Sequence, residues 1–227
     1  MVLEFRYFSP ACPEEFDWSS QFEEYCFRTD SEHDKQREVQ FVDVGCGYGG
    51  LLVSLSTLFP ETLMVGLEIR VKVSKYVMER IRALRSQHPG QYGNITCLRT
   101  NAMKYLPNYF KKNQLTKMFF LYPDPHFKKA KHKWRIISNN LLDEYAYFLG
   151  SGGVVYTITD VKEVFEWNVN HFSAHPMFER VSDAELSQDP VFPLLFESTE
   201  EGAKVTRNKG SKFHAVFRKR MTLNLDT

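Results

Sequence analysis

The chain has 227 residues, of which 43% are hydrophobic and 25% charged, as is ordinary for one large soluble globular domain. No apolar run is long enough to span a bilayer, and the first residues lack the basic and apolar segments of a secretory signal. The four cysteines form no CxxC pair, which excludes the common zinc and redox motifs and favours free thiols in a reducing compartment.

The net charge of +1 hides an uneven distribution of charge along the chain. From Ala11 to Asp34 there are eight acidic residues and one basic residue. Pro125 to Arg135 contains five Lys or Arg residues and no acid, and Lys204 to Arg220 contains seven and no acid. A basic run can be a solvated surface or a site for a polyanion, and composition alone does not decide between them.

We expect three parts along the chain. Residues 1–38 are acidic and aromatic without a sustained period, which predicts a partly irregular arm that wraps the domain or contacts a partner. Residues 39–220 alternate short apolar runs with helical stretches and form the main domain. Residues 221–227 are left as a C-terminal tail.

In chain order, short apolar runs predict six strands: Phe41–Val44, Leu63–Leu67, Ile95–Leu98, Met118–Leu121, Val154–Thr159 and Phe213–Phe217. Helices are predicted at Gly50–Phe59, Val71–Ser86, Ser138–Leu149 (closed by Gly150) and Val161–Phe172, and a capped helix start at Ser198–Gly202. Strands that alternate with helices form βαβ units. We therefore predict a doubly wound α/β fold with its ligand at the carboxyl ends of the strands.

A glycine-rich segment, Gly45-Cys-Gly-Tyr-Gly-Gly50, follows the first predicted strand and opens the first predicted helix. Glycines in this position let the backbone turn sharply and approach a ligand closely. Glu68 lies about twenty residues further on, at the end of the second strand, where it can accept hydrogen bonds from ribose hydroxyls. The pattern predicts a cofactor that contains a nucleoside.

Two cofactors compete for this arrangement. A dinucleotide such as NAD would place its pyrophosphate over the helix N-terminus. S-adenosylmethionine has no phosphate and carries an ammonium group, which the carboxylate of Asp43 can help to hold. We therefore favour S-adenosylmethionine, with a glycine turn that binds no ligand as the alternative. Asn101 and Ala102 follow the third strand, where we expect them to reach the adenine.

Asp124 is the candidate catalytic residue. It lies between Pro123 and Pro125 at the end of the fourth strand, and each proline fixes φ and stiffens the turn. Stiffness suits a carboxylate that must be held in one position over the cofactor. The turn resembles the Asp/Asn-Pro-Pro-aromatic turns of amino-group methyltransferases, while a rigid loop with a solvated aspartate remains the alternative.

The segment Phe127–Arg135 follows this turn directly and interleaves cations with aromatics, a combination that suits a phosphate backbone with exposed bases. We therefore expect a polyanionic substrate. His126 and His132 have no further metal-ligating residues nearby, so no metal site is predicted.

At these residues the chain resembles the tRNA (guanine-N(7)-)-methyltransferases, in particular the catalytic subunit of animals. The matching stretches are Asp43–Gly50, Gly66–Val73, Asn101–Lys104, Tyr122–Arg135 and Ser198–Gly202. The resemblance implies a class I, Rossmann-like methyltransferase with a mostly parallel seven-stranded sheet. It implies transfer of a methyl group from S-adenosylmethionine to N7 of a guanine in the variable loop of tRNA.

Pattern and resemblance together assign roles to residues. Asp124 matches the catalytic position. The expected cofactor contacts are Asp43, Gly45, Gly47, Glu68, Ile69, Arg70, Asn101, Ala102, Leu121, Thr199 and Glu201. The expected tRNA contacts are Lys72, Lys104, Lys128, Lys129, Lys131, His132, Lys133 and Arg135. The resemblance also implies a heterodimer with a WD-repeat β-propeller subunit and a location in the nucleus, with the cytoplasm as a second one, and neither a membrane nor a metal.

Three other functions stay open at this point, and Asp43 weighs against one of them, an NAD-dependent enzyme. A methyltransferase of a small-molecule or protein amine would keep the glycine segment and Asp124 but would not need the basic segment. A non-catalytic RNA-binding subunit would keep the basic segment and only a relic of the cofactor pocket.

Overall fold

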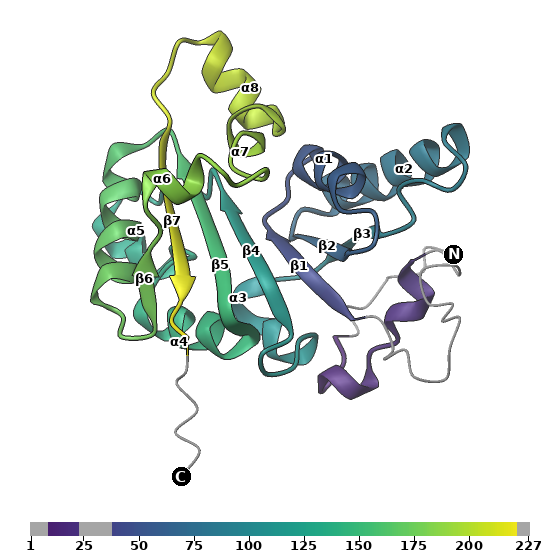
Figure 1. Ribbon diagram of the computed structural model, residues 1–227, viewed down its shortest axis with the longest axis horizontal. Coiled ribbons are helices and arrows are strands. Elements are labelled where there is room, and N and C mark those ends of the chain that lie inside the picture. Colours follow the sequence, from purple (N-terminus) through teal and green to yellow (C-terminus); the bar gives the residue numbers. More distant parts are fainter. Residues whose placement is uncertain (1–8, 23–37, 222–227) are drawn as a thin grey trace.

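The computed structural model describes residues 9–22 and 38–221. Its centre is a seven-stranded sheet of order β3-β2-β1-β4-β5-β7-β6 (Figure 1). Neighbouring strands are parallel from β3 to β5, whereas β7 is antiparallel to both β5 and β6. The strands are β1 (Val39–Val44), β2 (Leu63–Glu68), β3 (Ile95–Arg99), β4 (Leu115–Leu121), β5 (Leu149–Thr159), β6 (Phe178–Arg180) and β7 (Phe213–Lys219).

Helices cover both faces of the sheet, as a doubly wound fold requires (Figure 1). One face packs against α1 (Gly50–Leu58), α2 (Val71–Gln87), α6 (Asp183–Leu186) and α7 (Leu194–Glu197). The other packs against α3 (Ala102–Tyr105), α4 (Asn139–Phe148) and α5 (Lys162–Ala174). The remaining helix, α8 (Glu200–Arg207), projects with α7 beyond the carboxyl ends of the strands.

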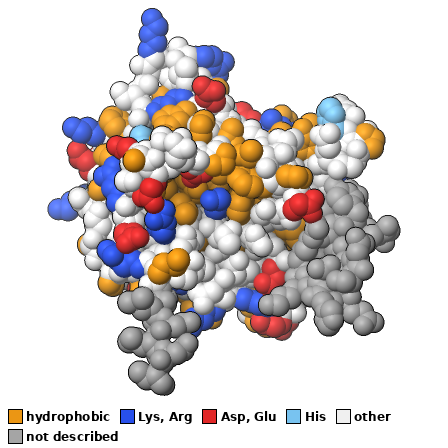
Figure 2. Space-filling model, viewed as in Figure 1, with side chains coloured by type: hydrophobic (Ala, Val, Ile, Leu, Met, Phe, Trp, Pro, Cys, Tyr) orange, Lys and Arg blue, Asp and Glu red, His pale blue; other side chains and the backbone are white. Residues whose placement is uncertain are grey.

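Hydrophobic periodicity explains how these helices dock. On α2, Val77 and Ile81 are one turn apart and buried, whereas Lys72, Lys75 and Arg82 are exposed. Figure 2 shows that hydrophobic side chains also gather on the visible face over β1 and β4, while Lys and Arg side chains extend from the projecting end near α8. Some of the cationic side chains are therefore displayed at the ligand end of the sheet, and others lie elsewhere on this face.

The predicted strands are all present, and the structure corrects some boundaries. The helix expected to close at Gly150 ends at Phe148, because Leu149 is already extended and pairs with Leu115 of β4. The glycines at 150, 152 and 153 conceal this first part of β5, since they interrupt its apolar pattern. The short strand β6 was not predicted, and its three residues are too few to show alternation.

The described part of the N-terminal arm, residues 9–22, packs against the main domain. Phe16 meets Trp18 and Tyr109 edge to face, with ring centroids 4.7 and 5.0 Å apart, and Trp18 stacks on Phe110 at 5.8 Å. This stretch contains two 3-10 turns, η1 (Pro13–Glu15) and η2 (Trp18–Gln21). The rest of the predicted arm, residues 1–8 and 23–37, and most of the tail, residues 222–227, lie outside the described residues.

A hollow of about 560 Å³ lies at the amino ends of the strands, between this arm, α4 and the segment that leads into β4. It is remote from the carboxyl ends, where the sequence predicts the cofactor. Within residues 9–22 and 38–221, no helix is long and apolar enough to cross a membrane. The same residues contain no group of three or more His, Cys, Asp or Glu side chains that could hold a metal ion.

Candidate active site

The glycine loop between β1 and α1 has one open side and one packed side. Gly45, Gly47 and Gly49 have φ values of 77°, 55° and 79°, in the left-handed region that glycine tolerates. A Cβ atom added at Gly45 or Gly47 would meet nothing within 4 Å. By contrast, a Cβ at Gly49 would lie 2.8 Å from Cγ1 of Val77, and one at Gly50 would overlap the carbonyl oxygen of Ser198. The loop can therefore take a ligand on the side of its first two glycines.

Asp43 lies directly below this loop at the end of β1, with 3% of its surface exposed. Burial, followed by the negative charges of Glu68 and Glu200, raises the pKa of Asp43 to about 7. A cation beside this carboxyl would stabilise its charged form. The environment suits an ammonium group and opposes a pyrophosphate, in agreement with the choice of cofactor made from the sequence.

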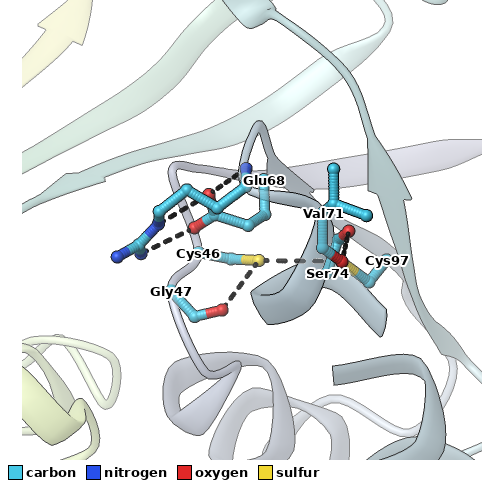
Figure 3. Close-up of polar contacts among 7 residues, drawn as sticks. Cys46, Gly47, Glu68, Val71, Ser74 and Cys97 are labelled. Atoms are coloured by element: carbon cyan, nitrogen blue, oxygen red, sulfur yellow. Dashed lines mark hydrogen bonds and ion pairs between the residues drawn. The ribbon is translucent and has the colours of Figure 1, made fainter. Parts of the chain in front are cut away.

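Glu68 and Arg70 are paired at the end of β2, and Asp124 lies near enough for its charge to act on Arg70. Oε1 of Glu68 accepts hydrogen bonds from the backbone N and from Nε of Arg70 at 2.8 and 3.1 Å, and Oε2 accepts one from Nη2 at 3.0 Å (Figure 3). The bond to Glu68 raises the pKa of Arg70, burial opposes this, and the charges of Glu68, Tyr48 and Asp124 add to it. The structure thus pairs two predicted site residues after β2, within electrostatic reach of a third, Asp124, after β4.

The side chain of Cys46 packs beneath the loop, against Cys97 and Gly66. Its Sγ lies 3.9 Å from Sγ of Cys97 on β3, and both side chains are buried beside Glu68 (Figure 3). A Cβ at Gly66 on β2 would approach the Cys46 sulfur to 2.6 Å, so the glycine leaves room for it. The hydrogen bond to Cys97 and burial raise the pKa of the Cys46 thiol, which makes it a poor nucleophile.

On the expected adenine side, Ile69 is 54% exposed at the end of β2. Asn101 follows β3 and caps α3, with Oδ1 accepting a hydrogen bond from the backbone N of Met103 at 3.1 Å. Ala102, which follows Asn101, is buried in the core on one face of the sheet, and Leu121 at the end of β4 is buried in the core on the other face. Because Oδ1 of Asn101 is used in the cap, we expect the side-chain amide nitrogen of this residue to make the contact with adenine.

Thr199 and Glu201 reach the site from the start of α8. Thr199 is the N-cap, and its Oγ1 accepts a hydrogen bond from the backbone N of Gly202 at 2.9 Å, which confirms the capped helix start. Glu201 pairs with Lys204 at 3.3 Å. Burial, then the charges of Asp160 and Glu201, raises the pKa of Tyr122 to about 12. The first turn of α8 therefore lies beside the end of β4.

The turn that carries Asp124 is backbone-strained on both sides. Tyr122 and His126 have φ values of 49° and 46°, which residues with side chains rarely adopt. Asp124 itself is exposed at the carboxyl end of the sheet. Strain of this kind persists only where the surroundings enforce it, and it concentrates at functional sites.

Arg135 is bonded to this turn, and its burial argues against the direct contact with tRNA that the sequence predicts. Its side chain is 3% exposed, Nε donates to the carbonyl oxygen of Pro125 at 2.9 Å, and Nη2 donates to Glu163 at 2.6 Å. The guanidinium also lies 4.7 Å above the ring of Trp167. A buried guanidinium with these partners fastens the catalytic turn to α5 and does not present itself to a phosphate.

His132 turns inward as well, with its ring edge-on to Trp167 at 5.3 Å and Nε2 3.4 Å from Glu163. The sequence reasoning missed Glu163 and Trp167. Their i, i+4 spacing on one face of α5 is a signal that could have found them.

The lysines of the basic segment are exposed, as expected. Nζ of Lys131 and of Lys133 lie 5.8 and 5.7 Å from the ring centre of Trp134, which is itself half-exposed. Phe127 is 68% exposed. The structure leaves Lys72, Lys104, Lys128 and Lys129 at the surface too, and their contact with RNA remains a prediction.

Comparison with known proteins points in one direction. The family described as "Putative methyltransferase" matches residues 37–215. The tRNA (guanine-N(7)-)-methyltransferase of Brugia malayi is 63% identical over 95% of this chain and 80% of its own. That of Xenopus laevis is 62% identical over 92% of this chain and 81% of its own. Among solved structures, geranyl diphosphate C-methyltransferase from Streptomyces coelicolor A3(2) has a TM-score of 0.50 and 17% identity, covering 81% of this chain and 74% of its own, which shows the shared fold.

Proposed function

Because the chain belongs to the tRNA (guanine-N(7)-)-methyltransferases, we infer that it transfers a methyl group from S-adenosylmethionine to N7 of a guanine in tRNA. The observation that carries this inference is the set of residues gathered at the carboxyl ends of the parallel strands. The open glycine loop, buried Asp43 and exposed Asp124 all lie at these ends, and the lysines of the basic segment follow Asp124 in the sequence. Neither an amine methyltransferase nor a relic RNA-binding subunit needs this whole combination.

When bound, the cofactor supplies a methyl group on a sulfonium centre. The in-plane lone pair of guanine N7 forms the new N–C bond, and the electron pair of the C–S bond remains on sulfur, which leaves a thioether. N7 carries no proton, so this step needs no general base. Catalysis therefore depends on positioning and on stabilising the positive charge that develops on the guanine ring.

Asp124 is placed for that task. Its carboxylate can accept a hydrogen bond from N1–H or from the exocyclic amino group of the guanine, and its charge stabilises the ring as it becomes cationic. Arg135 holds the turn through Pro125, so the carboxylate does not have to be ordered during each turnover. We expect Asp43 to hold the ammonium group and Glu68 the ribose of the cofactor, since both lie at the carboxyl ends of their strands.

The lysines at 128, 129, 131 and 133 would position the RNA backbone and would not specify the base. Half-exposed Trp134 and exposed Phe127 between them can stack on unpaired bases. A guanine in the variable loop must leave its stacking contacts to reach Asp124, and these aromatics offer a compensating surface.

The test is formation of 7-methylguanosine. The purified chain is incubated with labelled S-adenosylmethionine and a tRNA transcript, and the nucleosides are separated after digestion. A transcript that carries 7-deazaguanine lacks the accepting nitrogen and is the matched control. The proposal is supported if label appears in 7-methylguanosine with the normal transcript and not with the 7-deazaguanine transcript. Label in another nucleoside overturns it.

We also propose that the enzyme works as a heterodimer with a WD-repeat β-propeller subunit in the nucleus, and additionally in the cytoplasm. Support comes from family resemblance alone. Running the assay with and without a candidate propeller protein tests the partner: turnover unchanged by the addition, with no co-elution on gel filtration, counts against it. Imaging of a fluorescent fusion tests the location.

A further inference from the structure

Arg80 connects two halves of the cofactor site that the sequence keeps far apart. It lies on α2, and its Nη1 donates to the carbonyl oxygen of Tyr48 at 2.8 Å and to Oε1 of Glu200 at 2.6 Å. Tyr48 lies between two left-handed glycines of the loop, and Glu200 is the first residue of α8. One guanidinium nitrogen thus binds the loop and the helix start that carries Thr199 and Glu201.

The glycines on either side of Tyr48 place few steric limits on the backbone of the loop at this point. Gly47 and Gly49, on either side of Tyr48, have left-handed φ values of 55° and 79°, and glycine meets no steric penalty on leaving them. The ring of Tyr48 is 44% exposed and meets only the edge of half-exposed Tyr76, at 5.4 Å, among the aromatic contacts of the described residues. Holding the carbonyl therefore fixes the loop where its side chain does not.

The start of α8 packs closely against the glycine loop. Ser198 lies against Gly50, with no room for a Cβ between them, and a Cβ at Gly50 would come within 3.1 Å of the Glu200 carboxylate. Glu200 is also near enough to Asp43 for its charge to raise the pKa of that buried acid. The start of α8 therefore closes over the glycine loop, and Arg80 offsets the negative charge that this brings towards Asp43.

We propose that Arg80 is a positioning residue for the cofactor: it ties the Tyr48 carbonyl to Glu200 so that the glycine loop and the first turn of α8 form one binding surface. The inference rests on the cofactor site of the proposed function, but it concerns binding and does not depend on tRNA. As an ion pair it contributes little to folding, because the side chains of Arg80 and Glu200 are 30% and 42% exposed.

The experiment measures the Kd of S-adenosylhomocysteine by calorimetry for the wild type and for Arg80→Ala. Loss of one charge-assisted hydrogen bond to the loop should raise the Kd about tenfold. The midpoint of thermal unfolding should stay within a few degrees of the wild type. Arg82→Ala is the matched control, because Arg82 lies on the same helix and pairs with Glu79 at 2.7 Å without touching the loop. That variant should bind as the wild type does.

A double-mutant cycle with Glu200→Ala tests the link itself. In the Glu200→Ala background, Arg80→Ala should raise the Kd only about threefold, because the bond between Arg80 and Glu200 is already absent there. Arg80→Lys is the second variant if Arg80→Ala does not fold. Its Kd should also rise, because the lysine side chain is shorter and does not carry its nitrogen to the position of Nη1. Equal binding by Arg80→Ala and Arg82→Ala, or strictly additive losses in the cycle, would overturn the proposal. If the wild type does not bind S-adenosylhomocysteine, the proposed function itself fails.

Discussion

Asp43→Asn removes a carboxyl whose charge state the structure ties to cofactor binding. With a pKa of about 7, only about a tenth of the molecules carry the charge at pH 6, and about nine-tenths carry it at pH 8. If the ammonium group of the cofactor binds the charged form, the Kd should fall about tenfold from pH 6 to pH 8. In Asp43→Asn the Kd should be weaker at pH 8 and nearly constant over this interval.

The assay is calorimetry with S-adenosylhomocysteine, which keeps the ammonium group and resists turnover, at pH 6, 7 and 8. Gln40→Glu on the exposed side of β1 is a suitable control for a general change in charge, and it should leave the pH dependence intact. A wild-type Kd that does not change with pH, or an Asp43→Asn variant that keeps the tenfold slope, would refute the assignment of Asp43.

The same substitution has a consequence for stability, with a definite sign. The folded-state pKa of Asp43 is raised from 3.8 to about 7, so the folded protein binds the proton more tightly than the unfolded chain. Its contribution to the unfolding free energy is therefore complete below about pH 4 and is lost as the pH rises through 7. A shift of about three units corresponds to about 4 kcal/mol as an upper value. Urea unfolding at pH 8 should show Asp43→Asn to be more stable than the wild type, and the difference should shrink towards pH 5.

Three further predictions concern the catalytic turn and the basic segment. Asp124→Asn should lower kcat about 100-fold to 1000-fold in the 7-methylguanosine assay and leave the Kd of S-adenosylhomocysteine unchanged; undiminished turnover would remove Asp124 from the mechanism. Arg135→Lys keeps the charge but loses the guanidinium group that bonds to Pro125 and Glu163. The kcat should therefore fall at least about tenfold with an unchanged KM for the cofactor. A change confined to that KM would contradict this role. Replacing the four exposed lysines with glutamate should weaken tRNA binding and flatten its salt dependence by about 0.7 to 0.9 per lost phosphate contact, whereas the same reversal at Lys75 and Arg82 should not.

The sheet was predictable because its strands are buried on both faces and therefore appear as short, continuous apolar runs. All six residues of β2 are buried, for example. Parallel pairing then places Asp43, Glu68 and Leu121 at one edge, which the structure confirms. Apolar runs and chain direction together determine the cofactor end of the site, and both can be inferred from the order of residues alone.

The inward turn of Arg135 was not predictable in the same way. It and Lys133 are two positions apart in one basic segment, yet one is buried and the other exposed. The difference depends on Glu163 and Trp167, which come from a helix about thirty residues later and provide the environment in which burial of that charge is compensated. Local composition does not contain a partner of this kind.

The sheet and the segments that follow its strands carry different information about function. A solved methyltransferase at 17% identity shares the fold, and a shared fold does not say which atom receives a methyl group. The residues that we propose face a substrate come from two segments outside the strands, the basic segment after β4 and the start of α8 after β6. Because β7 runs antiparallel into the sheet, the chain before it must pass over the carboxyl ends, and this passage brings α8 onto the glycine loop. Substrate choice can therefore change with these two segments while the cofactor-binding strands stay the same.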